Sequence, residues 1–553
     1  MSVDNRTEIN DCDSNSGFQG DGSPSTVTLT GQFYEGTGAI QGQHTDTDEE
    51  TFTNDDSTGT AFSIDLSDAT VYFLIKDNLN DTYANGGIQL VLGETTADRA
   101  GYDVGGNDAP GVELSTGFRC IKGDGNVLDN TPGSHTVYAG TEANIAFTAI
   151  DSVGYGSLHL AKAQGNVANF FIDRITYIAN DSYALTINGG TSGTPETMAD
   201  VVGDDVTNGW GMVGNPLGKQ YVFAAPTEWG NATATAAAYF TATDEQWYWV
   251  GDNQGGRAVG ATHFPMRIVG NATDTIDVKW TNLVIVNTGQ RSEFTAGDTN
   301  VNVMQFEAVT FTDVGAITYT TQSASNRFAN NCVYNNCDQV YFNTMDMDGA
   351  IFNGSTDADG ALLWDASSNE ANQDNIRFNS DGTGHAIHIN LNTATASTFN
   401  IDGYTFDGYA GQDGTAGNRV FLITNPADGD ITINISNSEV LNQVGTGSGF
   451  SYELATGTTS TVTINNNITL TFTPLIAGSE VRVFNNSTGA EIGTGVESSG
   501  TSYAAQVPAN TAIDYKIVNP GYLEIYIKNQ TFTASQNIGV NQQVDRNFDP
   551  VDE

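Results

Sequence analysis

The chain has 553 residues, and its 19 Lys and Arg against 66 Asp and Glu give a formal net charge of −47. This length exceeds a single compact core and predicts several domains, while so few basic residues exclude a nucleic-acid partner, because phosphate contacts need Lys and Arg. With 38% hydrophobic residues, 15% charged residues and 62 glycines, the composition indicates a folded, turn-rich, all-β protein.

Residues 1–24 are polar and rich in turn-forming residues, and they lack the apolar core of a secretory signal. We expect them to form an N-terminal anchoring arm. The longest apolar stretches, such as residues 71–75, are strand-sized, which predicts no membrane insertion. Four cysteines are too few for a disulfide framework in so long a chain, so we expect reduced thiols at Cys12, Cys120, Cys332 and Cys337.

Residues 25–204 contain short apolar stretches separated by Gly, Asn and Asp, which is typical of strands in a β-sandwich. The clearest stretches are 26–30, 69–75, 87–92 and 170–178. The segments Glu35–Ile40 and Phe171–Ile175 are similar to the first and last strands of laminin-G or concanavalin-type jelly rolls. That resemblance implies a lectin-like sandwich, of a kind that often binds sugars.

Residues 205–265 hold most of the tryptophans of the chain. One interpretation is a tryptophan-rich cap or junction that covers the end of the repeat that follows, since an open end of stacked strands would aggregate. The alternative is an aromatic platform for glycan binding, with the candidate residues Trp247, Tyr248 and Trp249.

Residues 266–455 carry a loose repeat of short β-rich units, each with an apolar residue followed by Asn, Asp or Gly at the corner. Stacking successive units would bury the aromatic residues in one column, which is the logic of a solenoid. The motifs Phe352-Asn-Gly354 and Phe406-Asp-Gly408, with Cys332–Asn336, resemble right-handed parallel β-helices. The aromatic anchors are Phe311, Tyr334, Phe352, Phe378 and Phe406.

Residues 456–553 alternate apolar and polar residues with period two, as in 480–484 and 513–518, with turns between the alternating segments. We expect a small C-terminal β-sandwich. This segment resembles the immunoglobulin-like or carboxypeptidase-regulatory-like modules that often end phage structural proteins.

The sequence has no motif for nucleophilic catalysis, nucleotide binding or zinc, which favours a non-enzymatic role. Glycoside hydrolysis, however, needs only two carboxylates across a sugar, and adjacent turns of a solenoid would supply such pairs. Because acidic residues are abundant, such pairs also arise by chance, and the question of an enzyme stays open. The candidates are Asp346, Asp348, Asp374, Asp402 and Asp407.

Two acidic, Gly-containing segments offer oxygen donors for a hard cation such as calcium, although neither has the spacing of an EF-hand. Ordinary solvated turns are the favoured explanation of both segments, and no cofactor is required by the sequence. The calcium candidates are Asp124, Asn126, Asp129, Asp357 and Asp359.

Taken together, the polar arm, the lectin-like sandwich, the solenoid and the terminal module resemble bacteriophage virion proteins: capsid decorations, head fibres and tail spikes. The resemblance implies a homotrimer located on the virion, made without a signal peptide, bound to other virion proteins through the arm and contacting host-surface polysaccharide. Two alternatives remain, a tailspike-type polysaccharide depolymerase that uses solenoid carboxylates, and a glycan-binding adhesin.

Overall fold

The structure is a computed structural model in which the chain forms two compact units, Met1–Thr321 with Ser325–Phe328, and Gln322–Ala324 with Ala329–Glu553. The described residues are 2–15, 17–20, 27–30, 37–44, 48–56, 58–67, 69–76, 83–95, 97–103, 112–113, 119–124, 135–140, 145–159, 168–179, 182–230, 237–250, 266–270, 276–288, 291–297, 300–320, 324–368, 372–412, 414, 416–445, 449–492, 496–498, 500–509, 511–533 and 535–545.

The first unit begins with two antiparallel sheets, in the strand orders β10-β11-β7-β14-β5-β4, with β2 beside β14, and β12-β9-β8-β13-β6-β3. Apolar residues that alternate along these strands, including Ile40, Leu90 and Ile172, form one core between them. The strands are β2 Thr7–Asn10, β3 Phe18–Gly20, β4 Val27–Thr30, β5 Ala39–His44, β6 Asp48–Thr53, β7 Ala69–Lys76, β8 Tyr83–Thr95, β9 Asp98–Asp103, β10 Val112–Glu113, β11 Arg119–Asp124, β12 His135–Ala139, β13 Ser152–His159 and β14 Ala168–Ala179, with the 3-10 helix η2 at Phe147–Ala149.

The N-terminal residues are part of this unit, which corrects the expectation of an anchoring arm over residues 1–24. Strand β2 pairs with β14, β3 pairs with β6, and β1 (Ser2–Asp4) pairs with β15 (Leu185–Ile187). Ile9 and Cys12 are buried in the core. The segment is polar because its strands lie at sheet edges, and its few apolar residues suffice when neighbouring strands complete their burial.

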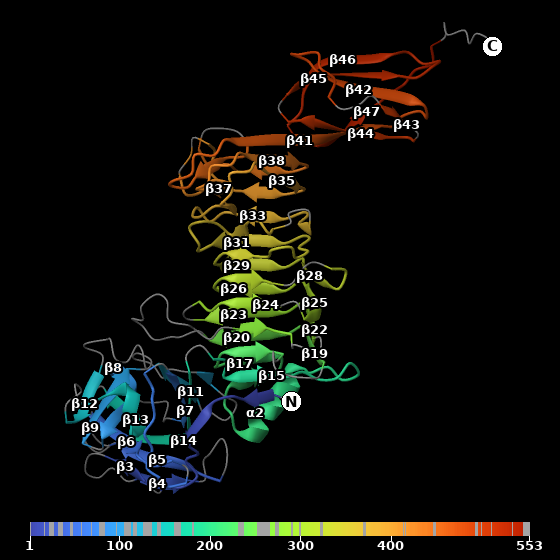
Figure 1. Cartoon of the computed structure of the whole chain (residues 1–553). Coiled ribbons are helices and arrows are strands. Elements are labelled where there is room, and N and C mark those ends of the chain that lie inside the picture. Colours follow the sequence, from blue (N-terminus) through green and yellow to red (C-terminus); the bar gives the residue numbers. More distant parts are fainter. Residues whose placement is uncertain are drawn as a thin grey trace. The chain divides into compact units, whose positions relative to one another are not determined.

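The rest of the first unit consists of rungs, meaning chain segments whose short strands pair in parallel with those of the next segment (Figure 1). Three sheets run through the rungs of this unit, in the orders β1-β15-β18-β21-β24-β27, β16-β17-β20-β23-β26 and β19-β22-β25. The elements are α2 Met198–Asn208, β16 Val213–Leu217, β17 Gln220–Phe223, β18 Thr227–Trp229, β19 Ala238–Thr243, β20 Gln246–Val250, β21 Met266–Ile268, β22 Ile276–Thr281, β23 Val284–Thr288, β24 Phe294–Ala296, β25 Val301–Glu307, β26 Thr310–Thr312 and β27 Ile317–Tyr319.

Helix α2 is the one α-helix among the described residues. Thr197 caps its N-terminus in a capping box with Asp200, and Gly209 ends it in the left-handed conformation that favours glycine. The helix contacts the edge strands β1 and β16. Helix α2, rather than the tryptophans, therefore covers strands at the beginning of the rungs.

The second unit continues with rungs of the same kind, in the strand orders β30-β32-β34-β37-β40, β29-β31-β33-β36-β39 and β35-β38-β41. Its elements are β28 Arg327–Asn330, which begins before the division between the units, β29 Val333–Cys337, β30 Val340–Tyr341, β31 Ile351–Ser355, β32 Leu362–Trp364, β33 Arg377–Asn379, β34 Ile387–Asn390, β35 Ser397–Asp402, β36 Thr405–Asp407, β37 Phe421–Thr424, β38 Ile431–Ser436, β39 Glu439–Leu441 and β40 Tyr452–Leu454.

An aromatic column fills the interior of these rungs, as the repeat predicts. The rings of Tyr334 and Phe352 stack with centroids 4.8 Å apart, those of Phe352 and Phe378 at 4.8 Å, and those of Phe378 and Phe406 at 5.2 Å. In-register parallel pairing places each ring above the last. The spacing equals the distance between neighbouring strands, so one aromatic residue in each rung is enough to build the column.

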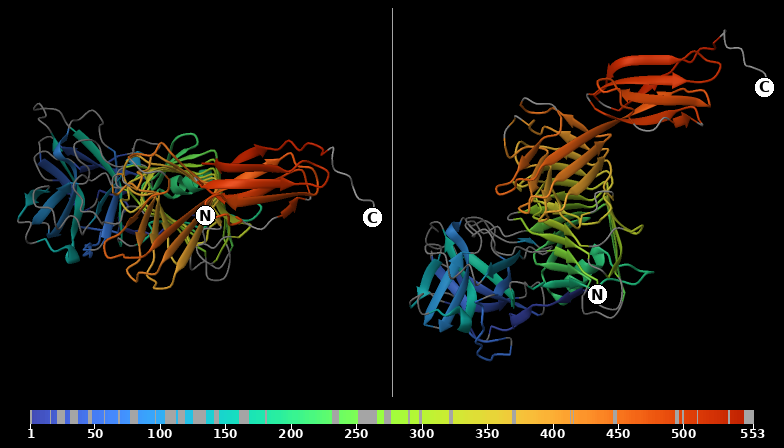
Figure 2. Two further views of the ribbon diagram at one scale, coloured as in Figure 1. Left: turned by 90° about the horizontal axis from the view of Figure 1, so that it is seen from above. Right: turned by 45° about the horizontal axis from the view of Figure 1, so that its top comes forward.

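Strand β41 (Val462–Thr473) joins the rungs to a C-terminal pair of sheets. Its first half pairs in parallel with β38, and its second half pairs with β44 and β47. The second sheet has the order β43-β42-β45-β46 and forms a second layer beside the first (Figure 2). Apolar residues such as Leu470 and Ile517 form the core of this pair of sheets. These strands are β42 Ser479–Asn485, β43 Val496–Ser498, β44 Tyr503–Pro508, β45 Ala512–Val518, β46 Ile525–Thr531 and β47 Gln536–Gly539.

The protein is therefore all-β, as the composition predicts. In the part of the chain that the structure describes, no helix is both long and apolar enough to cross a membrane.

Candidate functional site

Four of the five candidate carboxylates gather at one corner of the rungs in the second unit. At this corner the chain turns through a residue with positive φ, which favours Gly and Asn. The corner residues are Asn331, Gly349, Asn375, Gly403 and Asn437. Their backbone N–H groups join successive rungs; for example, Gly349 N donates to Asp374 O at 3.0 Å, and Gly403 N donates to Ser436 O at 3.1 Å.

The residue before the corner is acidic in three successive rungs, namely Asp348, Asp374 and Asp402. All three side chains are exposed, and Asp346, which is half-buried, lies close enough to Asp348 and Asp374 to feel their charges. Neighbouring strands are about 4.8 Å apart, so the fold stacks like charges in what we call the acidic column (Asp346, Asp348, Asp374 and Asp402).

Corner asparagines partly compensate this repulsion. Asn375 Nδ2 donates to Asp348 Oδ1 at 3.0 Å, and Asn437 Nδ2 donates to Asp402 Oδ1 at 2.7 Å. The equivalent corner residue for Asp374 is Gly403, which has no side chain to donate. No other described residue donates a hydrogen bond to the Asp374 carboxylate.

Two members of the acidic column have raised pKa values. Burial raises the pKa of Asp374, and the charges of Asp348 and Asp402 raise it further. The pKa of Asp346 is also raised, first by burial and then by Asp348 and Asp374. Both groups therefore hold their protons to a higher pH than an ordinary aspartate does.

Asp407 belongs to a separate arrangement. It lies on β36, where its Oδ2 accepts a hydrogen bond from Arg377 Nη2 of β33 at 2.8 Å and its Oδ1 accepts one from Asn442 Nδ2 at 2.8 Å. Hydrogen bonds between a carboxylate and a guanidinium are charge-assisted and stronger than those between neutral groups. Asp407 is thus a link between three neighbouring rungs.

The chemistry of the acidic column is ambiguous from spacing alone. Carboxylates on adjacent strands match the separation of about 5 Å that retaining glycosidases use, and a raised pKa suits a general acid. In contrast, Asp348 and Asp402 are already bonded to corner amides of the next rung. The bonding pattern is that of a ladder that ties rungs together.

The expectation of an aromatic glycan platform at Trp247, Tyr248 and Trp249 is wrong for the two tryptophans, because both are buried. Trp247 and Trp249 are 0% exposed, because alternate residues of β20 point into the rungs. The Trp247 ring stacks on Trp229 with centroids 5.0 Å apart and meets Trp280 edge-on at 4.9 Å. Tyr248 points the other way and is half-buried, but a single ring is no platform.

The calcium candidates divide into two groups. Asn126 and Asp129 lie outside the described residues, and Asp124 ends strand β11. Asp357 Oδ1 accepts a hydrogen bond from Asp359 N at 2.8 Å, which is an ordinary Asx turn. Across the described ranges, no group of three or more His, Cys, Asp or Glu side chains is arranged to hold a metal ion.

Sequence reasoning found the acids but missed the amides that bind them. The signal was present in the repeat Asp374-Asn-Ile-Arg-Phe378, in which the carboxylate, the corner residue and the aromatic anchor follow in fixed order. The same order recurs at 348–352 and 402–406, with glycine at the corner. Reading that corner position as alternately Asn and Gly would have predicted which acid lacks a donor.

Comparisons with known proteins add little. No protein-family model matches the chain, and no curated protein matches it. Among solved structures, the chain is similar at 10% identity to one described as "Structural analysis of an exo-beta-agarase", over 32% of this chain and 26% of that chain, with a TM-score of 0.21. A likeness this distant carries no argument about function.

Proposed function

We propose that the protein is a non-enzymatic structural protein displayed on a bacteriophage particle, as a capsid decoration, head fibre or spike. In this proposal the first two sheets form a jelly-roll sandwich, the rungs form a right-handed parallel β-helix, and the C-terminal sheets form an immunoglobulin-like sandwich. Because β2 and β3 pair within the first two sheets and parallel pairing of rungs begins at β15, the proposed limits are 7–179 for the first sandwich, 185–455 for the helix and 456–553 for the last sandwich.

One observation carries the non-enzymatic part of the proposal: the polar residues of the rungs are engaged with each other. Asp348 and Asp402 accept hydrogen bonds from corner amides, and Asp407 is paired with Arg377. Side chains on neighbouring rungs also form amide ladders, in which Asn353 donates to Asn335 at 2.7 Å and Asn379 donates to Asn353 at 2.6 Å. Such ladders stabilise stacked strands and leave few groups for chemistry.

In this proposal the N-terminal residues contact other virion proteins, and because β1 and β2 are paired within the first unit they would do so as part of a folded surface. Homotrimerisation through the faces of the rungs remains part of the proposal. The acidic surface suits a displayed protein, because a charge of −47 keeps copies soluble and apart until a specific contact forms.

The test is to purify particles from the source culture, identify their proteins by mass spectrometry and reconstruct their surface by electron microscopy. The proposal predicts that this chain is a stoichiometric component with trimeric density. Particles that lack the chain would overturn it.

The second candidate is a polysaccharide depolymerase, which the raised pKa values of Asp346 and Asp374 favour. It predicts that the purified protein releases oligosaccharides from host-surface polysaccharide, and that Asp346→Asn or Asp374→Asn abolishes release. Asp407→Asn serves as the control, because that carboxylate is outside the acidic column. Release that survives both column variants would exclude the column as the catalytic site.

A further inference from the structure

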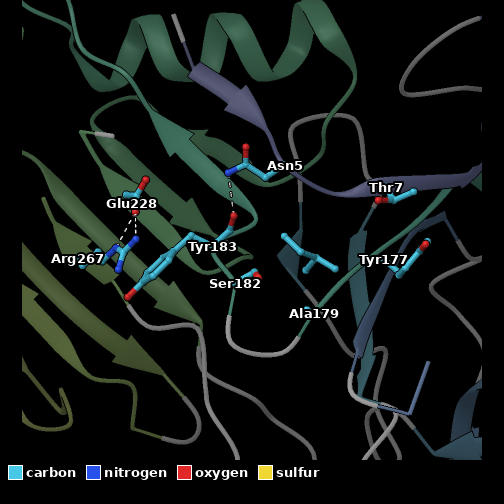
Figure 3. A pocket seen from close by; sticks show the side chains of 9 residues that line it. Asn5, Thr7, Tyr177, Ala179, Ser182, Tyr183, Glu228 and Arg267 are labelled. Atoms are coloured by element: carbon cyan, nitrogen blue, oxygen red, sulfur yellow. Dashed lines mark hydrogen bonds and ion pairs between the residues drawn. The ribbon is translucent and has the colours of Figure 1, made fainter. Parts of the chain in front are cut away.

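A polar cavity of about 480 Å³ lies within the first unit, where the chain passes from strand β14 into the first rungs (Figure 3). Its lining comes from three places: the N-terminal segment, the end of β14 with the residues after it, and the outer face of strands β18 and β21. The residues that matter here are Asn5, Thr7, Tyr177, Tyr183, Glu228 and Arg267. None of them was a candidate from the sequence.

Glu228 and Arg267 face the cavity because of strand alternation. In β18 the neighbouring residues Thr227 and Trp229 are buried, and in β21 Met266 and Ile268 are 1% exposed. Parallel pairing places Glu228 directly beside Arg267. The guanidinium Nε donates to Glu228 Oε2 at 2.7 Å, and Nη2 donates to the same oxygen.

This geometry leaves hydrogen-bonding capacity on both partners. Arg267 uses two donors on one oxygen, so within the described residues Glu228 Oε1 has no donor and Arg267 Nη1 has no acceptor. The Glu228 side chain is 9% exposed and that of Arg267 is 38% exposed. The pair is thus a fixed acceptor and a fixed donor, side by side at a cavity wall.

Tyr183 supplies an aromatic surface and a hydroxyl. The Arg267 guanidinium lies over its ring, 4.2 Å from the centroid, while Asn5 Nδ2 donates to Tyr183 O at 2.9 Å and to Thr186 Oγ1 at 2.7 Å, which fixes the segment. Burial raises the pKa of Tyr183, so at neutral pH its phenol remains a donor. Figure 3 shows Tyr177 and Thr7 on the opposite side of the cavity from Tyr183, Glu228 and Arg267.

We propose that this cavity binds a neutral saccharide of one or two rings, with the Glu228–Arg267 pair contacting neighbouring hydroxyl groups and the Tyr183 phenol donating a further hydrogen bond. Adjacent hydroxyls present a donor and an acceptor at the separation that an aligned carboxylate and guanidinium offer. The volume falls in the range of small-molecule sites. This goes beyond the structural role proposed above, and either proposal can fail without the other.

Charge decides against other ligand classes. The cavity carries one cation and one anion that neutralise each other, so neither a phosphate nor a metal ion finds an uncompensated partner. An anion would also approach a chain of net charge −47. An apolar ligand would bury the ion pair and the amide without new partners, which is costly.

The test is saturation-transfer NMR and calorimetric titration of the full chain with glucose, galactose, mannose, N-acetylglucosamine and their disaccharides, with glucuronic acid and inorganic phosphate as anionic probes. We expect at least one neutral sugar to bind with a dissociation constant of about 0.1 to 10 mM. No binding by any neutral sugar, or binding by the anions alone, would overturn the proposal.

Three variants locate the site. Arg267→Met should weaken sugar binding at least about tenfold, and Tyr183→Phe should weaken it severalfold. Arg377→Met is the matched control, since it removes a comparable inter-rung ion pair outside the cavity and should leave binding unchanged. Circular dichroism confirms that the variants fold. If Arg267→Met misfolds, Tyr183→Phe decides alone, and unchanged binding in a folded cavity variant would contradict the assignment.

Discussion

In the second unit, side chains stack at the spacing of neighbouring strands both in the interior of the rungs and at their corner. The stacking is stabilising in the interior and destabilising at the corner. Inside, Tyr334, Phe352, Phe378 and Phe406 stack ring on ring at 4.8 to 5.2 Å. At the corner, the acidic column stacks carboxylates at the same strand spacing, and the charges of Asp348 and Asp402 add to burial in raising the pKa of Asp374. Repetition stabilises aromatic residues, whose contacts are attractive, and penalises like charges.

The corner also shows how the chain limits that penalty. Asn375 and Asn437 each place an amide against a carboxylate of the preceding rung, whereas Gly403 does not. The position of each residue in the rung therefore determines how much it stabilises the fold. Substitutions inside the rungs and at the corner should lower the free energy of unfolding by different amounts.

The largest effect is expected inside. Phe378→Ala removes the ring that both Phe352 and Phe406 contact and leaves a cavity, so we expect the free energy of unfolding to fall by about 3 to 5 kcal/mol. Chemical denaturation followed by circular dichroism measures it. Asn379→Ala, one residue along and facing outward, is the control and should cost far less. Equal losses in the two variants would mean that the column contributes no special stability.

A smaller loss is expected at the corner. Asn375→Gly keeps the positive φ but removes the amide that donates to Asp348 Oδ1, so we expect a loss of about 0.5 to 1.5 kcal/mol. The same denaturation experiment applies. A loss that persists when Asp348 is also changed to Asn would show that the amide acts through some other contact.

The smallest loss of stability is expected when the exposed ion pair between Arg377 and Asp407 is removed. Arg377 and Asp407 are partly exposed, so Arg377→Met should cost at most about 1 kcal/mol, and less at high salt. Unfolding at low and high ionic strength checks this. A salt-independent loss would contradict an electrostatic role for the pair.

The sequence predicted the aromatic column well and the residues of the proposed saccharide site poorly, for physical reasons. Phe352, Phe378 and Phe406 recur in one local motif, so their stacking follows from periodicity. Trp247 and Trp249 look like a platform until strand alternation places both inside. Glu228 and Arg267 are 39 residues apart and meet only through the register of β18 and β21, which no local pattern specifies.

The N-terminal segment teaches the same lesson. Residues 1–24 are too polar to fold alone, which suggested an arm, but β1 and β2 need only one neighbouring strand each, and these partners lie far along the chain. The composition of a segment indicates how much apolar surface it can bury by itself. Whether it forms a strand depends also on the partner strands that the rest of the chain supplies.

The central claim is that stacking on successive rungs stabilises aromatic side chains and destabilises carboxylates. The most direct test is to compare the free energy of unfolding of Asp374→Asn with that of the natural chain between pH 3 and pH 8. Because the folded-state pKa of Asp374 is raised above its usual value of 3.8, ionisation costs the folded state stability as the pH rises through that window. The account predicts that the variant is more stable at pH 7, by a few tenths of a kcal/mol given screening of an exposed group, and that the gain disappears at the lowest pH. A variant that is less stable than the natural chain at pH 7 would contradict it.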